Sequence, residues 1–96
     1  MVRVRVEAFD SETGQPIPNG IVKFWRDAEI RNGKLVAKKP RPDYIDATNA
    51  DGVAELEVEP GDYVITFESQ LWSPVMEEKR IDRPGVIKIE TTKAFV

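Results

Sequence analysis

Residues 48–69 read TNADGVAELEVEPGDYVITFES and contain two segments in which apolar and polar residues alternate. A period of two is typical of a β-strand with one buried face. The two apolar faces are, in order, Ala54, Leu56 and Val58, then Tyr63, Ile65 and Phe67. We therefore expect two strands that cover a hydrophobic core and turn their other faces, including three glutamates, toward solvent.

A turn precedes each of these strands. Asn49–Gly52 has turn composition, and Gly52 is expected to have a positive φ because glycine lacks the Cβ that clashes there. Pro60-Gly61 fits a type II turn, in which proline fixes its own φ and glycine takes the positive value. We therefore expect the two strands to pair as an antiparallel hairpin.

The strand pattern also extends toward the N-terminus. Residues 2–8 alternate from the start of the chain, which predicts a half-buried first strand. Residues 21–26 predict a second strand, in which Val22 and Phe24 face the core and Trp25 faces the other way.

The region between the second strand and residue 44 is the least regular. Within it, Asn32-Gly33 separates two short β-compatible segments in Ile30–Leu35. Both turn residues accept a positive φ, so the pattern predicts a type I′ β-hairpin. Residues 44–48 predict another short strand.

The last third of the chain predicts two more strands, at residues 75–81 and 86–92, joined by a turn that contains Pro84 and Gly85. A loop that contains Trp72 precedes them. Residues 93–96 form a short tail that is apolar at its end.

No segment has the period of a helix, and about seven short strands alternate with Gly/Pro turns. We therefore predict an all-β fold: a single antiparallel Greek-key β-sandwich of about seven strands, with a β-hairpin insertion after the second. Ninety-six residues are enough for one domain, residues 1–96. Its predicted core consists of Val4, Val6, Val22, Phe24, Leu56, Val58, Ile65, Phe67, Ile87 and Ile89.

Composition excludes several classes of function. The net charge of −3 and the pI of about 5.0 argue against a nucleic-acid partner. The absence of histidine removes the commonest general base and metal ligand, and the absence of cysteine removes disulfides and thiolate sites. We therefore expect no enzyme activity, no cofactor and no metal site.

The sequence gives little information on cellular location. No segment has the length of a transmembrane helix and no signal peptide is visible, so membrane insertion is not expected. Two alternatives stay open: a cytoplasmic protein, or an extracellular domain whose signal has been removed. The high charge, with few Gln and Met, fits a thermophilic source.

Two segments, VEAFDSETGQPIPNGIVKF (residues 6–24) and TNADGVAELEVEPGDYVITF (residues 48–67), resemble the carboxypeptidase regulatory-like domains and their transthyretin-like (prealbumin-like) relatives. The likeness covers Val2–Phe67. The matching positions are Asp10, Thr13, Gly14, Pro16, Val22, Thr48, Gly52, Leu56, Pro60, Gly61 and Tyr63. The resemblance implies a β-sandwich in which Tyr63 is a corner residue that packs its ring and bonds its hydroxyl to a nearby strand.

The resemblance also raises two reactions. Some transthyretin-like relatives are hydroxyisourate hydrolases that use histidines, an arginine and a C-terminal Tyr-Arg-Gly-Ser; this chain has no histidine and ends in Lys-Ala-Phe-Val. Collagen-adhesin B-type repeats form an isopeptide bond from a lysine on the first strand. Arg3 and Arg5 stand there instead, and arginine stays protonated. Only Lys23, on the next strand, leaves that reaction open.

A calcium site is a third alternative. Asn49-Ala50-Asp51-Gly52 resembles part of an EF-hand loop, but Ala47 and Val58 occupy the first and twelfth ligand positions. A plain turn is therefore the better interpretation, and an incidental site on Asp43, Asp46 or Asp51 the alternative.

Trp25 and Trp72 are the candidate binding residues. An exposed tryptophan can stack on a sugar or anchor a protein partner, whereas a packed one closes an open end of the sandwich. A basic run, Lys34, Lys38, Lys39 and Arg41, is interpreted as a solvated hairpin arm.

The sequence thus predicts a non-catalytic structural or protein-interaction module, either a unit of a larger surface or filamentous assembly or an accessory domain. Its partner would be another protein or a second copy, bound through a sheet edge or through the tail Phe95-Val96. The alternative is a carbohydrate-binding module that uses an exposed tryptophan.

Overall fold

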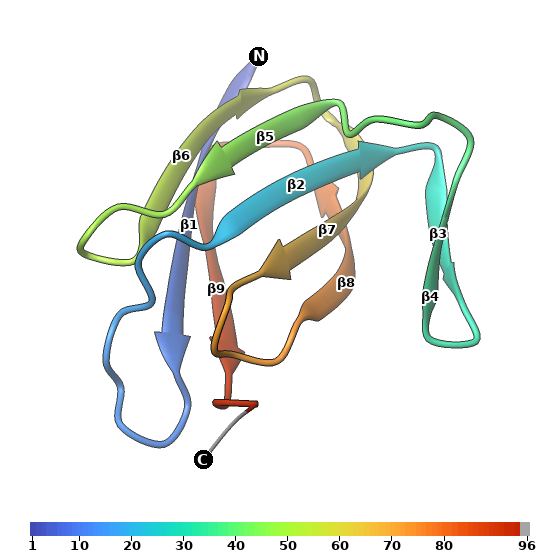
Figure 1. Ribbon diagram of the computed structural model, residues 1–96. Helices are drawn as coiled ribbons and strands as arrows, with labels where there is room; N and C mark the ends of the chain where they lie inside the picture. The colour runs from blue at the N-terminus through green and yellow to red at the C-terminus, as the bar shows by residue number, and fades with distance from the viewer. Residues whose placement is uncertain (95–96) are drawn as a thin grey trace.

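The computed structural model describes residues 1–94, which form nine β-strands and no helix (Figure 1). The strands are β1 (Val2–Asp10), β2 (Ile21–Arg26), β3 (Ala28–Arg31), β4 (Lys34–Ala37), β5 (Tyr44–Ala47), β6 (Val53–Val58), β7 (Gly61–Glu68), β8 (Val75–Ile81) and β9 (Gly85–Thr91). Within these residues there is no helix long and apolar enough to cross a membrane. Phe95 and Val96, the end of the predicted tail, lie outside the described residues.

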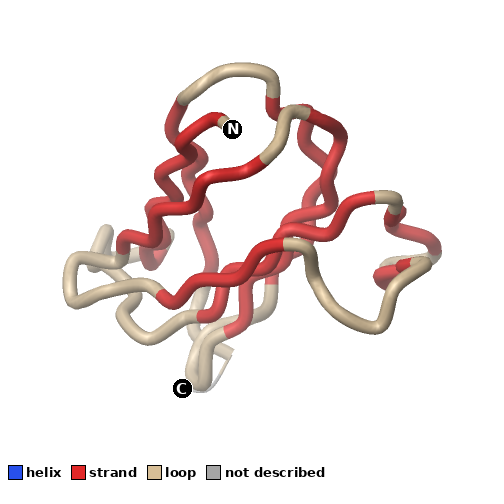
Figure 2. The backbone as a smooth tube through the Cα atoms, turned by 90° about the horizontal axis from the view of Figure 1, so that it is seen from above, coloured by secondary structure: helices blue, strands red, loops and turns tan. Residues whose placement is uncertain are grey.

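Seven of the strands form two sheets that pack face to face. One sheet has the order β6-β1-β9 and the other β5-β2-β7-β8. The chain changes sheet between β1 and β2, β5 and β6, β6 and β7, and β8 and β9, as Greek-key connections require. The view from above shows the two layers, with the hairpin of β3 and β4 projecting to one side (Figure 2). The predicted fold class is confirmed.

The core lies between the two sheets. All ten predicted core residues are buried, from fully enclosed Phe24 and Phe67 to Leu56 at 6% exposure. The alternation of apolar and polar residues predicted them correctly, because each sheet has one face on the core. It missed Ile17, which is fully buried although Pro16 and Pro18 flank it. The Ile17 amide donates to the Ala8 carbonyl, which holds this extended segment along β1.

The Asn-Gly hairpin is confirmed. Asn32 and Gly33 have φ values of 53° and 74°, and Arg31 pairs with Lys34 across the turn. The predicted positive φ of Gly52 is also confirmed, at 73°.

The expected hairpin of β6 and β7 is wrong. β6 pairs with β1, with Val4 opposite Leu56, whereas β7 pairs with β2 and β8 in the opposite sheet. The two-residue link Glu59-Pro60 therefore crosses from one sheet to the other. Sequence alternation shows which face of a strand is apolar, but both sheets of a sandwich offer such a face, so it does not assign the sheet.

Gly61 does not match the predicted type II turn, and its surroundings differ from those expected. It does not have a positive φ. Instead, a Cβ at this position would lie 2.7 Å from the guanidinium Nη2 of Arg26. Glycine at 61 therefore leaves room for Arg26 to cover the link between the sheets.

Among the described strands, one pair departs from the antiparallel prediction: the first strand and the last. β1 and β9 run parallel, in register from Val4 opposite Gly85 to Asp10 opposite Thr91. Local sequence cannot predict this pairing, because it depends on how often the chain reverses direction and changes sheet between residues 10 and 85.

The hairpin arm covers part of the outer face of the four-stranded sheet. Val64 and Thr66 point away from the core, yet their exposures are only 0% and 6%. Trp25 is in register with Val64 and bonds to Thr66, and the arm contacts both β7 and β8. A second apolar layer therefore lies outside this sheet.

Candidate interaction surfaces

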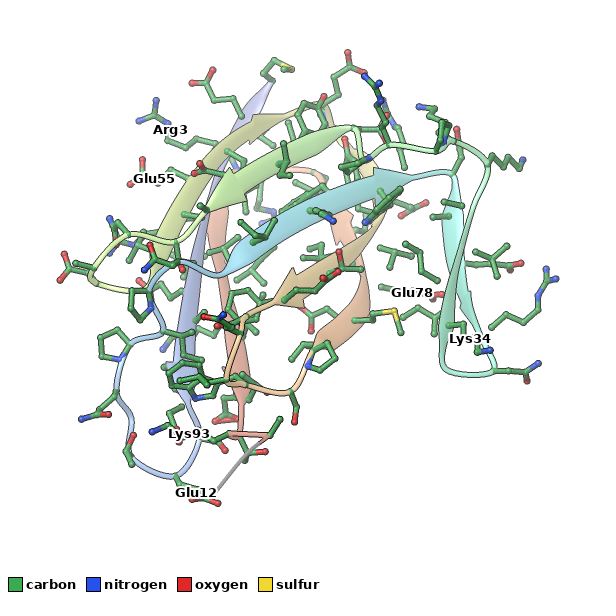
Figure 3. The ribbon with its side chains drawn as sticks, in the orientation of Figure 1. Arg3, Glu12, Lys34, Glu55, Glu78 and Lys93 are labelled. Atoms are coloured by element: carbon green, nitrogen blue, oxygen red, sulfur yellow. The ribbon has the colours of Figure 1, made fainter. Side chains whose placement is uncertain are left out.

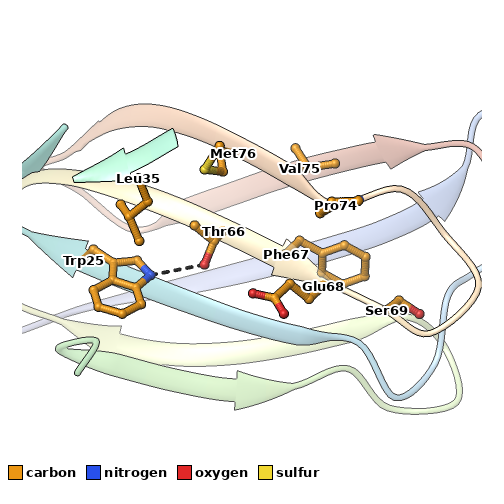
Figure 4. A pocket seen from close by; sticks show the side chains of 9 residues that line it. All are labelled: Trp25, Leu35, Thr66, Phe67, Glu68, Ser69, Pro74, Val75 and Met76. Atoms are coloured by element: carbon orange, nitrogen blue, oxygen red, sulfur yellow. Dashed lines mark hydrogen bonds between the residues drawn. The ribbon is translucent and has the colours of Figure 1, made fainter. Parts of the chain in front are cut away.

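A groove of about 440 Å³ lies between the hairpin arm and strands β7 and β8 (Figure 4). Trp25 lies at one wall, because the alternation of β2 that buries Phe24 turns the next side chain outward. The Trp25 Nε1 donates to Thr66 Oγ1 at 3.1 Å, which fixes the indole. Its polar atom is thus occupied, and the groove presents the indole mainly as apolar surface.

The other walls of the groove are also largely apolar. Leu35 comes from the arm, Pro74 from the loop before β8, and Val75 and Met76 from the start of β8. Glu68 is the single carboxylate among the lining residues, and it is exposed. This arrangement suits an apolar side chain.

Trp72 does not line this groove. It lies in the loop between β7 and β8, partly buried against the core. Its Nε1 donates to Asp10 Oδ2 at 3.0 Å, and Lys93 Nζ lies 5.5 Å from the ring centroid. The two predicted binding residues are therefore in different places, each with its indole N–H already bonded within the chain.

Asp10 is a buried carboxylate with three hydrogen-bond donors around it. Besides Trp72, its Oδ1 accepts the backbone N–H groups of Glu12 and Thr13 at 2.8 and 3.2 Å. The bond from Trp72, followed by that from the Glu12 amide, lowers the pKa of Asp10. Asp10 thus stays ionised and joins the end of β1 to the Trp72 loop. Sequence reasoning missed this pair because 62 positions separate the two residues.

A cluster around Tyr63 closes the link between the sheets. As the resemblance implies, the Tyr63 hydroxyl donates to the Glu59 carbonyl. Arg26 donates to the Glu59 carboxylate at 2.7 Å and to the Pro60 carbonyl at 2.6 Å, and its guanidinium lies 5.7 Å from the Tyr63 ring centroid. Burial raises the pKa of Tyr63 to about 12. This cluster is a structural corner in which Tyr63 keeps its proton at neutral pH.

The outer face of the three-stranded sheet is charged (Figure 3). Arg3 bonds to Glu57 at 3.2 Å, and Arg5 lies 3.7 Å from Glu55. These side chains are about half exposed or more, so each pair contributes little to stability. The predicted solvated glutamate face on β6 is confirmed, with arginines from β1 beside it.

Two chemical hypotheses remain, a calcium site and an isopeptide bond from Lys23, and the described residues show no arrangement that fits either. Asn49 Oδ1 accepts hydrogen bonds from the backbone N–H groups of Asp51 and Val53. This segment is therefore a turn, the interpretation that the sequence favoured over a calcium loop. Residues 1–94 contain no group of three or more acidic side chains placed to hold a metal ion. Lys23 lies on the outer face of β2, in the sheet opposite β9, which separates its amine from the last strand.

Two surfaces therefore offer contacts to another molecule: the apolar groove and the sheet edges. On one side of the sandwich the edge strands β5 and β6 meet, where Asp46 Oδ2 accepts the Glu55 amide and Tyr44 Oη accepts the Glu59 amide. The opposite edges, β8 and β9, have no comparable contact with each other in the described residues. The sandwich is thus closed along one side, whereas on the other side the described contacts gather at one end, where the loop before β8 bonds to Thr91 and Thr92.

No protein-family profile matches the sequence, and no curated protein matches it at a significant level. Solved structures do share the fold. The major pilin subunit of Bacillus cereus superposes with a TM-score of 0.69 at 13% identity, over 97% of this chain and 30% of the pilin. The minor pilin of Streptococcus agalactiae gives 0.62 at 15% identity, over 99% of this chain and 45% of that protein.

A third similar structure is the 5-hydroxyisourate hydrolase of Klebsiella pneumoniae, with a TM-score of 0.54 at 20% identity, over 98% of this chain and 94% of the hydrolase. The chain spans less than half the length of the two pilins. At these identities the likeness shows the fold alone. The chain is a β-sandwich of the kind found in pilin subunits and in transthyretin-like proteins.

Proposed function

We propose that this chain is a non-catalytic structural module of the carboxypeptidase regulatory-like kind, one unit of a larger surface or filamentous protein assembly. The observation that carries this proposal is that the buried polar side chains all form hydrogen bonds within the chain. The structure describes four, and each is hydrogen-bonded to another part of the chain: Asp10, Thr48, Thr66 and Thr91. These groups are committed to joining loops and strands, as a structural module requires.

The similar structures support the same function. Two of them are pilin subunits, in which a domain of this size occupies less than half of the chain. The hydrolase shares the fold, but the hydrolase chemistry implied by the resemblance uses histidines, and this sequence has none.

The open side of the sandwich supports a contact through β9. Ser11 N donates to Thr91 O, so the odd-numbered residues of β9 turn their backbone groups toward β1. Because successive residues of a strand point their backbone groups to opposite sides, Val86, Lys88 and Glu90 turn theirs toward the open edge. An unpaired edge of this kind can accept another strand.

Charge favours β9 of a second copy as that strand. In an antiparallel pair of β9 strands centred on Ile89, Lys88 of each copy stands opposite Glu90 of the other. Centring the pair on Lys88 instead would place two lysines opposite each other, which is unfavourable. The sequence of the edge therefore favours one register of self-association.

Sedimentation velocity over a range of concentrations tests this proposal. The wild type should form a dimer as concentration rises. Lys88→Glu replaces two attractions by two repulsions and should weaken the dimer on the order of ten-fold. The double variant Lys88→Glu/Glu90→Lys should restore it.

Lys79→Glu is the matched control, because Lys79 is an exposed lysine on β8. A wild type that stays monomeric at every concentration would overturn self-association through this edge. Equal weakening by Lys79→Glu and Lys88→Glu would overturn the assignment to β9.

A further inference from the structure

The two ends of the described chain lie at opposite ends of two neighbouring strands. The chain enters at the start of β1 and leaves after the end of β9, and Figure 1 shows the termini at the top and bottom of the molecule. β1 and β9 are adjacent and parallel in one sheet. A force that pulls the ends apart therefore acts along these strands and in opposite directions on the two.

This geometry is shear. The seven register pairs from Val4–Gly85 to Asp10–Thr91 lie across the direction of the force and are loaded together. If the force instead acted across the strands, the pairs would open one after another from one end. Bonds that are loaded together share the force, whereas bonds that open in succession bear it one at a time. Each hydrogen bond contributes only a modest free energy by itself, so the pair resists a higher force in shear.

β9 is the strand that has to slide. Among the described residues it is an edge strand with β1 as its single sheet partner, whereas β1 is also paired with β6 through six further register pairs. Ile87 and Ile89 are buried and resist sliding through the core. The β1–β9 pair is thus the interface where an end-to-end force would first separate the fold.

The point where the chain leaves β9 is reinforced by the Trp72 loop. Thr91 Oγ1 donates to the Ser73 carbonyl at 2.6 Å, and Ser73 N donates to the Thr92 carbonyl at 2.9 Å. Ala94 N donates to the Leu71 carbonyl at 2.8 Å. In the same loop Trp72 bonds to Asp10 at the end of β1, so this loop joins both strands of the sheared pair.

We infer that this domain resists force applied along the chain, with the parallel β1–β9 pair as a shear clamp and the Trp72 loop as its latch. The inference deepens the proposed structural function, since a unit of a surface or filamentous assembly transmits tension through its ends. It gives Trp72 a mechanical role in place of a ligand contact.

Single-molecule pulling along two axes tests the clamp. The native chain has no cysteine, so one introduced thiol is a unique handle. With the other handle fused to the N-terminus, Ala94→Cys pulls along β1 and β9. Arg83→Cys attaches at the turn before β9, beside the start of β1, and peels the pair from that end. Both positions are exposed, so the two variants should have matching thermal stability.

We expect a rupture force several-fold higher through position 94 than through position 83. Equal forces, or a lower force through position 94, would overturn the clamp. The two proposals fail separately: a monomeric protein with a high rupture force through position 94 contradicts self-association only, and a dimer without this anisotropy contradicts the clamp only.

Trp72→Phe tests the latch, because it keeps an aromatic ring and removes the N–H donor to Asp10. Trp25→Phe is the matched control, since it removes an N–H donor to Thr66 that lies outside the sheared pair. The rupture force through position 94 should fall more for Trp72→Phe than for Trp25→Phe when both are compared at equal thermal stability. Equal losses would overturn the latch.

Discussion

At the scale of single residues, the polar side chains that matter most join segments that are distant in sequence. Asp10 connects the turn after β1 to the Trp72 loop, and Tyr63 connects β7 to the carbonyl of Glu59. The sequence predicted the corner role of Tyr63 through the family resemblance. It did not predict the partner of Trp72, because no local pattern relates that residue to Asp10.

Asp10 should make stability depend on acid pH. Its pKa is lowered in the folded protein from an ordinary value of 3.8. The stabilisation is therefore present above about pH 4 and is lost as pH falls through the lower, folded-state pKa. Asp10→Asn keeps the oxygen that caps the turn, but it places an NH₂ group opposite the Trp72 N–H. The variant should therefore be less stable at neutral pH, and its free energy of unfolding should depend less on pH in the acid range.

Urea denaturation at a series of pH values measures this effect. Asp51→Asn is the control, because the Asp51 side chain is exposed and caps no turn. An unchanged acid dependence in Asp10→Asn would contradict the assignment.

Tyr63 should make stability depend on alkaline pH. The pKa of Tyr63 is raised from 10.0 to about 12 in the fold, so the unfolded chain loses this proton first. Its contribution is complete below about pH 10 and is lost between about pH 10 and 12. Tyr63→Phe should remove this loss and lower the free energy of unfolding at neutral pH by about 1–2 kcal/mol, because the Glu59 carbonyl loses its donor.

Chemical denaturation at neutral and alkaline pH checks both parts of this prediction. Tyr44→Phe is the comparison, since Tyr44 is less buried and its oxygen accepts the Glu59 amide. If Tyr44→Phe alone flattened the alkaline slope, the corner assignment to Tyr63 would be wrong.

At the scale of elements, the prediction worked where the deciding contacts are local. The Asn32-Gly33 hairpin follows from the φ values that two adjacent residues accept, and the strand at Val75–Ile81 was predicted with its observed bounds. The predicted pairing of β6 with β7 was wrong, because the same alternation of apolar and polar residues fits a strand in either sheet. The groove was missed for a related reason: nothing in Ile30–Leu35 shows that the arm folds back over β7 and β8.

The hairpin arm should open without the rest of the fold. Gly33 has a φ of 74°, and a Cβ there would meet no atom within 4 Å, so Gly33→Ala adds backbone strain of about 1 kcal/mol without a clash. We expect faster amide exchange in Ile30–Leu35 and a more exposed Trp25, with the β1–β9 pair unaffected.

Hydrogen exchange resolved by residue and tryptophan fluorescence measure this opening. Gly14→Ala is a matched control, because Gly14 has nearly the same φ and equally open surroundings in the turn after β1. Equal loss of arm protection in both variants would show that the arm has no independent stability.

At the scale of the whole molecule, the two layers and the buried core were within reach of the sequence, since composition, alternation and turn residues all agree. The open side of the sandwich and the parallel contact of the first and last strands were not. Both follow from the path of the chain between the sheets, which residues remote from one another determine together.

The pairing of β1 with β9 has a consequence for synthesis. β1 is the first strand to be made and lies at the centre of its sheet, yet one neighbour, β6, begins at Val53 and the other, β9, at Gly85. During translation both edges of β1 stay unpaired until β6 and β9 have been made, whereas the β3–β4 hairpin can already form. Contacts this distant in sequence slow folding, and a nascent chain that stopped short of Gly85 would leave a strand template exposed to aggregation.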